Sequence, residues 1–202
     1  MSDMARPREF EIDDALSDAM NVFWEQGYDA ASLPALLRGM GLTRGSFYKA
    51  FSDKKSLFIK SLNRYEIEAV GPAVDLLTTG PLDGQERIDR LYATVVDAVR
   101  NGDRRGCLLC SAAAGQAAVD TDIAGLVHLQ LGKMQAAFEV ALSQSAAHAD
   151  AEPKERAETA WLLLSQYVGL RVLARANASV ETLTHITQAL HRLVSLPRNP
   201  AG

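Results

Sequence analysis

The chain is short of several residue types and of positive charge. Of its 202 residues, two are cysteine, two are tryptophan and 6% are aromatic, and the formal net charge is -4. Two cysteines are too few for a disulfide framework, which fits a reducing compartment. A negative net charge argues against a protein that coats nucleic acid indiscriminately, because that role needs a strongly basic surface.

Long hydrophobic runs are absent too. The N-terminus, MSDMARPREFEIDD, has no apolar run of signal-peptide length, and the most apolar stretch, WLLLSQYVGLRVLA, is interrupted by Gln166 and Arg171. We therefore expect a cytoplasmic protein with no membrane partner. The residues that are present, 48% hydrophobic and 23% charged, suit an ordinary globular chain with an adequate core.

Helical periodicity covers nearly the whole chain, and no useful alternating strand pattern or internal repeat interrupts it. The sequence therefore predicts an all-α fold. A first helix is expected over residues 10–25, with Gly27 closing it. Later helices are expected near residues 84–101, 106–119, 122–147, 154–176 and 180–195, with NGDRRG and HADAEP as the clearest loops.

Short helices follow the first one closely. Ser32 is a candidate N-cap for a helix that ends at Gly41, Thr43 for a third helix, and Ser52 with Asp53 for a fourth. The fourth should run to about Val70, bend at GP and end near TTGPLDG. Two short helices joined by a tight glycine turn, with the first helix packed behind them, form a helix-turn-helix unit.

The second helix of this unit opens with an unfavourable residue. In GLTRGSFYKAF, Gly45 stands where a helix would favour alanine, yet a residue without a side chain lets the backbone approach base edges in the major groove. Arg44 can then pair with a guanine edge, while Tyr48 and Lys49 reach phosphates and Lys54 holds a further phosphate.

The charges around this helix are nearly all positive. Between residues 41 and 65 the only acid is Asp53, and the cations are Arg44, Lys49, Lys54, Lys55, Lys60 and Arg64. This predicts a basic edge on an acidic protein. A packed helical corner that carries a few cations is the alternative, and Phe23, Phe47 and Phe51 are expected in its core.

At this point the sequence resembles a family. The run GYDAASLPALLRGMGLTRGSFYKAFSDKKSLF is similar to the DNA-binding signature of TetR-family transcriptional regulators, and the matching positions are Gly27, Tyr28, Ser32, Gly41, Tyr48, Phe51, Lys54 and Leu57. The departures are Pro34 and LLRGMG, which stands where the family usually has an alanine-rich helix end.

The resemblance implies two domains, a helix-turn-helix head at residues 1–55 and a larger helical ligand-binding and dimerisation domain at residues 56–202. It implies a one-component regulator that is not an enzyme and has no cofactor. It would be a repressor that binds a palindromic double-stranded DNA operator as a homodimer and is released by a small-molecule effector. The expected DNA contacts are Ser32, Thr43, Arg44, Gly45, Ser46, Tyr48, Lys49 and Lys54.

The last two helices are the expected dimer interface. Apolar residues occupy nearly the whole circumference from Ala160 to Ala174, more than one bundle face requires. On the following helix they form a seam, Leu183, Ile186, Leu190 and Leu193. Two helices from each subunit would make a four-helix interface, whereas an internal core helix in a monomer is the alternative.

The two cysteines lie three residues apart in GCLLC, directly after DRRG. On a helix Cys107 and Cys110 would share a face, and a helix N-terminus and two arginines both favour thiolate. They could sense an electrophile or oxidant, or be small apolar residues in a helical wall. A thiol enzyme with a helical Cys-x-x-Cys is a third interpretation, but Ala113 stands where its histidine is needed.

The effector pocket is expected among helices that carry small and apolar residues around a few polar groups. The candidates are Cys107, Cys110, Gln116, His128, Gln166 and Tyr167. With no glycine-rich phosphate loop, such a pocket suits an uncharged or mostly apolar organic ligand that binds noncovalently. No metal site is expected, because no histidine lies at ligand spacing from the cysteines.

Overall fold

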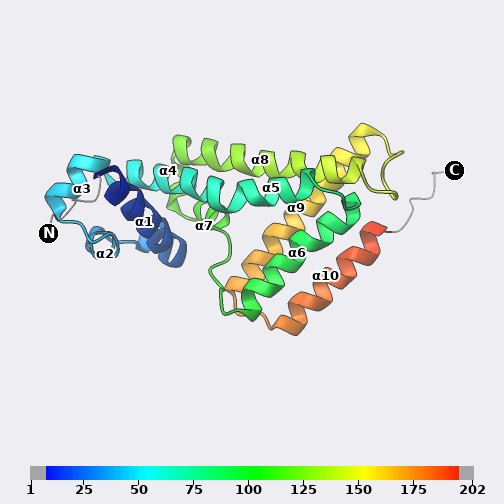
Figure 1. Cartoon of the computed structure of the whole chain (residues 1–202). Coiled ribbons are helices and arrows are strands. Elements are labelled where there is room, and N and C mark those ends of the chain that lie inside the picture. Colours follow the sequence, from blue (N-terminus) through cyan, green and yellow to red (C-terminus); the bar gives the residue numbers. More distant parts are fainter. Residues whose placement is uncertain (1–7, 196–202) are drawn as a thin grey trace, which may run out of the picture.

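The computed structural model describes residues 8–195, and every regular element in that range is a helix (Figure 1). The all-α expectation is confirmed. The first 51 residues supply α1 (Arg8–Ala30), α2 (Leu33–Gly39) and α3 (Arg44–Phe51), which we call the head. The remaining elements are α4 (Lys54–Tyr65), the π-helix η1 (Glu66–Val70), α5 (Gly71–Thr78), α6 (Gly84–Arg100), α7 (Leu108–Ala114), the 3-10 helix η2 (Gln116–Val119), α8 (Thr121–Ser143), α9 (Pro153–Arg175) and α10 (Val180–Ser195).

Side-chain caps start the short helices of the head. Ser32 accepts from the Ala35 N–H at 3.2 Å, Thr43 from the Ser46 N–H at 3.2 Å, and Asp53 from the Ser56 N–H at 2.7 Å. These caps confirm the expected starts of α2, α3 and α4, because each one satisfies a backbone donor that a helix leaves free. Gly27, with φ 79°, interrupts the helical geometry of α1 where the helix was expected to end.

The long connection out of the head departs from its expected form. A helix to Val70 with a bend at Gly71 and Pro72 was predicted, but a π-helical turn comes first and α5 begins at Gly71. The Gly71 N–H bonds to the Glu66 carbonyl, five residues back. Pro72 has no N–H to donate and its ring crowds the preceding turn, which favours such a wide turn just before it.

The predicted helix over residues 106–119 is two elements. Helix α7 begins at Leu108 with Cys107 as its N-cap, and the extended backbone of Gly115 separates it from η2. A Cβ on Gly115 would lie 2.6 Å from Asp29 Oδ2, so the break lies where the chain passes close against the head. Helix α8 ends at Ser143 rather than near residue 147.

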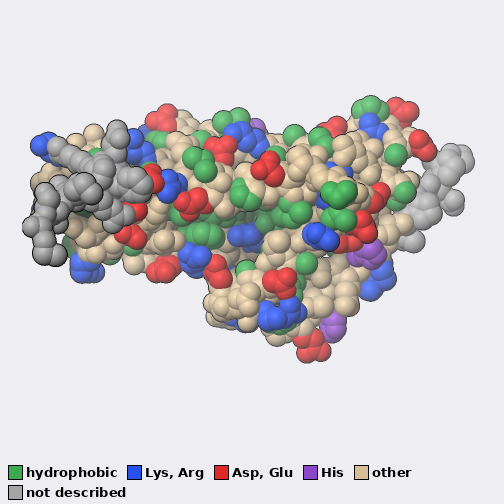
Figure 2. All heavy atoms as spheres, in the orientation of Figure 1, with side chains coloured by type: hydrophobic (Ala, Val, Ile, Leu, Met, Phe, Trp, Pro, Cys, Tyr) green, Lys and Arg blue, Asp and Glu red, His purple; other side chains and the backbone are tan. Residues whose placement is uncertain are grey.

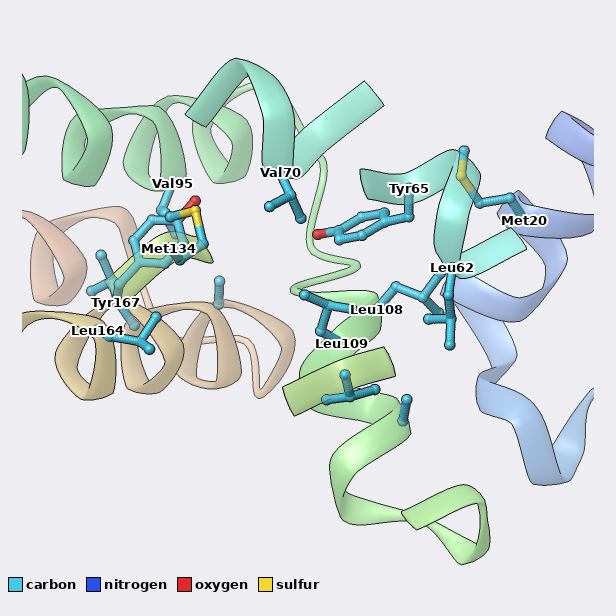
Figure 3. Close-up of a cluster of buried hydrophobic side chains, with 14 of the residues drawn as sticks. Met20, Leu62, Tyr65, Val70, Val95, Leu108, Leu109, Met134, Leu164 and Tyr167 are labelled. Carbon is cyan, nitrogen blue, oxygen red and sulfur yellow. The ribbon is translucent and has the colours of Figure 1, made fainter. Parts of the chain in front are cut away.

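Buried side chains form one continuous cluster through the molecule. Phe23, Phe47 and Phe51 lie in its head end, as expected, and the cluster continues through Leu62 and Tyr65 to Tyr167 (Figure 3). Helix α8 lies along α5 and α9, while α6 packs against α8, α9 and α10 (Figure 1). Within residues 8–195, no helix is long and apolar enough to cross a membrane.

The seam expected on α10 is divided between two faces. Leu183 and Leu190 are buried, and α10 packs against α6 of its own chain. Leu193 is 70% exposed, and Ile186 is partly buried. The heptad-like spacing therefore reflects mainly internal packing, which corrects the expectation that all four residues face a second subunit.

Candidate functional site

The first turn of α3 is exposed. Thr43, Arg44, Gly45 and Ser46 are all exposed, whereas Phe47 at the end of this turn is fully buried. The Thr43 and Ser46 hydroxyls lie 3.0 Å apart and bond to each other, so the turn is held from within. The buried side of α3 thus fixes a helix whose first turn remains available to a partner.

Gly45 has no neighbour to accommodate. A Cβ built on this residue would meet no atom within 4 Å, and the glycine lines an open hollow with Leu42, Thr43, Ser46 and Lys49. Packing within the chain therefore gives no reason for glycine at this helical position. Glycine here would leave room for a partner outside the chain to approach the backbone closely.

Two further expected contacts lie on the same helix. The Arg44 guanidinium lies 5.8 Å from the centre of the Tyr48 ring, and Tyr48 is 48% exposed. Lys49 is exposed one turn after Gly45. Ser32, by contrast, uses its hydroxyl to cap α2, although the residue itself is exposed.

The basic edge is smaller than the sequence suggests. Lys55 pairs with Asp120 at 2.8 Å and Asp122 at 2.7 Å, and Arg64 pairs with Asp13 and Glu68, so carboxylates of other segments offset both cations. Lys54 lies 4.6 Å from the centre of the Tyr28 ring, and partial burial lowers its pKa. Figure 2 shows acidic and basic side chains interspersed over the visible face of the molecule.

A small cavity, partly open to solvent, lies between α4, η1, α5, α8, α9 and the start of α7. Its volume is about 30 Å³, which is room for about one water molecule, and most of its lining is apolar. The lining side chains include Ala69, Val70, Leu131, Met134, Leu164 and Val168, together with the polar groups of Tyr65, Cys107, Tyr167 and Arg171. Figure 3 shows Tyr65, Met134, Leu164 and Tyr167 around this region.

Arg171 carries the one formal positive charge of this lining. Its guanidinium donates to the Tyr167 hydroxyl at 2.9 Å, to the Tyr65 hydroxyl at 3.5 Å and to the Gly106 carbonyl at 2.8 Å. Burial raises the pKa of both tyrosines, which keeps the phenols neutral. The charge of Arg171 is therefore solvated by neutral oxygens.

The two cysteines form a coupled pair beside this arginine. Hydrogen bonding from the Cys110 thiol and the positive charge of Arg171 lower the pKa of Cys107 to about 6. The pKa of Cys110 is raised, because its proton is held by Cys107 and it is largely removed from water. This lowered pKa favours the thiolate form of Cys107.

The other expected pocket residues are not gathered here. His128 is exposed on α8, and Gln166 is exposed on α9 and lines a separate groove against α10. Cys110 hydrogen-bonds to Cys107 but is not among the residues that line the cavity, and the side chain of Gln116 lies outside the described part of the chain. The helical phase corrects the grouping: Gln166 immediately precedes Tyr167 and therefore points about 100° away from it.

Sequence reasoning missed Arg171 and Tyr65 as cavity residues. A signal for Arg171 was present, since it follows Tyr167 by four residues and so shares its helix face. No comparable signal exists for Tyr65, whose hydroxyl meets Arg171 across 106 positions of sequence.

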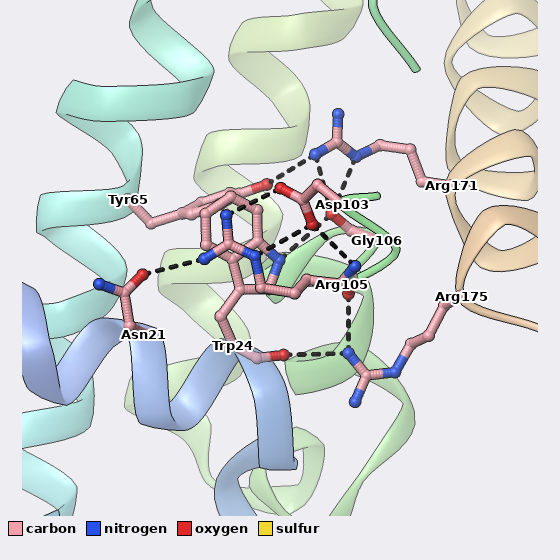
Figure 4. Close-up of polar contacts among 8 residues, drawn as sticks. All are labelled: Asn21, Trp24, Tyr65, Asp103, Arg105, Gly106, Arg171 and Arg175. Atoms are coloured by element: carbon pink, nitrogen blue, oxygen red, sulfur yellow. Dashed lines mark hydrogen bonds and ion pairs between the residues drawn. The ribbon is translucent and has the colours of Figure 1, made fainter. Parts of the chain in front are cut away.

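A polar junction joins the cavity to the head (Figure 4). The Gly106 carbonyl accepts from Arg171 and also from the Trp24 indole N–H at 3.2 Å. The Arg105 guanidinium lies 3.9 Å from the centre of the Trp24 ring and donates to Asn21. Arg175 bonds to the Arg105, Trp24 and Glu25 carbonyls. The segment before α7 is therefore attached to α1 and to α9 at once.

Comparison with known proteins gives one consistent result. The model of the family "Bacterial regulatory proteins, tetR family" matches residues 15–60, which contain most of α1 and all of α2 and α3. The chain is 26% identical over 190 residues to the HTH-type transcriptional repressor ComR of Escherichia coli, covering 93% of this chain and 90% of ComR. It is 27% identical over 183 residues to the uncharacterized HTH-type regulator YezE of Bacillus subtilis, covering 89% and 94%.

A solved structure agrees along most of the chain. A cysteine mutant of the TetR family transcriptional regulator CifR, complexed with 26-bp double-strand operator DNA, superimposes with a TM-score of 0.80. That protein is 30% identical, and the match covers 93% of this chain and 98% of CifR. The exposed first turn of α3, the matched head and the shared architecture lead to one assignment: the chain belongs to the tetR family of bacterial transcriptional regulators.

Proposed function

We propose that the chain is a one-component transcriptional repressor that binds a palindromic operator as a homodimer and leaves it when a small molecule enters the cavity. The observation that carries the proposal is the uncovered backbone at Gly45, beside the exposed Arg44 and Tyr48. In helix-turn-helix proteins the first turn of the second helix contacts base edges. Operator binding by CifR and the repressor name of ComR support the same interpretation.

Arg44 and Lys54 have different roles in this proposal. Arg44 reads one base, so Arg44→Ala should cost about 1 to 3 kcal/mol on the operator and relax preference at that position. Lys54 holds a phosphate, so Lys54→Ala should weaken all duplexes similarly and flatten the salt dependence.

The test begins with a map of the genomic sites that the purified protein binds. Fluorescence anisotropy at several salt concentrations then compares the operator with a random duplex. Lys154→Ala is the matched control, because its ammonium is exposed on α9, away from the head. Equal losses of both head variants on both duplexes would contradict the division of roles, and the absence of any duplex preference would contradict the proposal itself.

A second copy of the chain would cover the apolar surface of α9 and α10. Large apolar side chains stand exposed there, namely Trp161, Leu162, Val172, Leu173 and Leu193. A groove between the two helices, lined by Leu162, Gln166, Ile186 and Leu193, continues this surface. Exposed apolar surface of this kind is typical of an association site, and two-fold pairing would give the operator its inverted repeat.

Release requires that the effector prefer one conformation. A ligand that bound the DNA-competent and the released states equally would shift nothing. The cavity borders α4, which begins in contact with the head, and Arg171 of its lining belongs to the junction of Figure 4. An organic ligand must widen a space of about 30 Å³, and this widening can act on the head through both segments.

Covalent sensing by Cys107 is a second candidate, favoured by its lowered pKa and its place in the cavity wall. A thiolate would attack an electrophilic carbon, or oxidation would join Cys107 to Cys110. The variant with Cys107→Ser and Cys110→Ser separates the two mechanisms. Noncovalent release survives in this variant, whereas covalent sensing predicts that it stays on the operator when iodoacetamide or peroxide releases the parent protein.

A further inference from the structure

Among the residues that the structure describes, Arg171 has no carboxylate partner. Its guanidinium bonds to two phenols and one carbonyl, and it forms no ion pair with a carboxylate among the residues that the structure describes. The nearby Asp103 is already engaged, because the Arg105 guanidinium bonds to both of its oxygens, at 3.0 and 2.8 Å. A partly buried guanidinium with no carboxylate beside it is incompletely compensated, so a carboxylate that reached it would be held strongly.

The remainder of the cavity restricts what that anion can be. The walls away from Arg171 are built from Ala69, Val70, Leu131, Met134, Leu164 and Val168. Such walls favour an apolar body and would penalise a second charge. A planar guanidinium matches the two oxygens of a carboxylate better than it matches a single acceptor.

We propose that the effector is an organic monocarboxylate with an apolar body, that its carboxylate pairs with Arg171, and that this pairing frees the Gly106 carbonyl from Arg171. This rests on the proposed function and changes the expected ligand from an uncharged molecule to an anion. Cys107 is the rival anion within the cavity, so a bound carboxylate also takes over the role of its thiolate beside Arg171.

Because Arg171 and Trp24 donate to the same Gly106 carbonyl, pairing of Arg171 with a carboxylate should change a hydrogen bond of the head. Arg171 Nη2 and Trp24 Nε1 both donate to the Gly106 oxygen, at 2.8 and 3.2 Å. The backbone there is also tight against α9, because a Cβ on Gly106 would lie 3.0 Å from the Arg171 carbonyl oxygen. When the guanidinium turns to a carboxylate, the loop loses one of its two anchors on α9 and keeps the bond from Arg175 to the Arg105 carbonyl, and the Trp24 contact on α1 changes with it.

Matched acids and amides test the ligand class without DNA. Benzoate, phenylacetate, 4-phenylbutyrate and octanoate, each beside its primary amide, are titrated into the full chain by calorimetry. At least one acid should bind at millimolar concentration or below, and at least tenfold more tightly than its amide. Arg171→Met should remove that difference, and Arg171→Lys should retain a smaller one. Arg100→Met, which removes an exposed arginine on α6, should leave it unchanged.

The second measurement follows the indole N–H of Trp24. With Trp161→Phe, Trp24 is the one remaining tryptophan, so a single indole resonance reports the bond to Gly106. The acid that binds should shift this resonance, while its amide should not. Circular dichroism establishes whether each variant is folded. If Arg171→Met does not fold, the comparison of acids with amides on the parent protein still tests the proposal.

Three results would overturn the proposal: no acid binds, acids and amides bind alike, or a bound acid leaves the Trp24 resonance in place. Operator binding is measured separately by anisotropy. A chain that binds no operator would remove the proposed function, yet calorimetry would still decide whether Arg171 selects carboxylates.

Discussion

Gly45 combines an unfavourable helix residue with empty surroundings. Because nothing lies within 4 Å of the added methyl group, Gly45→Ala should raise the free energy of unfolding by about 0.5 to 1 kcal/mol. The same methyl group should weaken operator binding several-fold, because it stands where the backbone meets the bases. Thermal unfolding and anisotropy measure the two effects.

Gly125→Ala is the matched control for this exchange. Gly125 lies on α8 and also has no atom within 4 Å of the added methyl group. The Gly125→Ala variant should be more stable than the parent protein and should bind the operator with the same affinity. If Gly45→Ala binds the operator as the parent does, the close approach at α3 is contradicted.

Cys107 should react at lower pH than an ordinary thiol. Because its pKa is lowered to about 6 by the Cys110 hydrogen bond and Arg171, thiolate predominates above that pH and is lost as the pH falls through it. Alkylation by iodoacetamide, followed residue by residue with mass spectrometry, should therefore reach half its maximal rate near pH 6. Arg171→Met should move this midpoint upward, while Cys110 should react slowly throughout. A midpoint near pH 9 in the parent protein would contradict the coupling.

Helix starts could be predicted from the sequence because their causes are local. Ser32, Thr43 and Asp53 each cap a backbone N–H three residues away. The π-turn at η1 and the break at Gly115 were missed, since one depends on how Pro72 is accommodated and the other on contact with Asp29. The cavity was predicted only in part, because Tyr65, Cys107 and Arg171 meet through tertiary packing that no spacing rule contains.

The contact between α6 and α8 leaves no room for a side chain. A Cβ on Gly84 would lie 1.8 Å from the Ala141 carbonyl oxygen, and the Gly84 N–H bonds to the Gln144 carbonyl at 3.0 Å. Gly84→Ala should therefore destabilise the fold by about 3 kcal/mol or more, since backbone meets backbone and neither can yield cheaply. Urea denaturation measures this.

Gly132→Ala on α8 provides the contrast, because its added methyl group would meet no atom within 4 Å. This variant should be neutral or slightly more stable. Equal urea midpoints for Gly84→Ala and Gly132→Ala would contradict this prediction, because they would show that α6 and α8 can move apart at little cost in stability.

Association of two chains is a property of the whole molecule. Leu193 is 70% exposed beside the groove of α9 and α10, so Leu193→Asp should place a charge inside the proposed interface and shift the chain toward monomer. Sedimentation velocity at micromolar concentration measures the shift. Ile67→Asp is the control, because Ile67 is 71% exposed on η1, outside α9 and α10. A monomeric parent protein would sink the dimer proposal.

The π-turn shifts which face of the α4–α5 connection is buried. Along the α4–α5 connection, buried positions run through Phe58, Leu62 and Tyr65 and resume at Val70 and Leu77. The step from Tyr65 to Val70 is five residues, whereas an α-helix would repeat its face after three or four. A π-turn is in effect an α-helix with one residue inserted. One extra residue rotates everything that follows it by about 100° about the helix axis. The orientation of the head relative to α5 and the helices packed on it therefore depends on this single inserted residue.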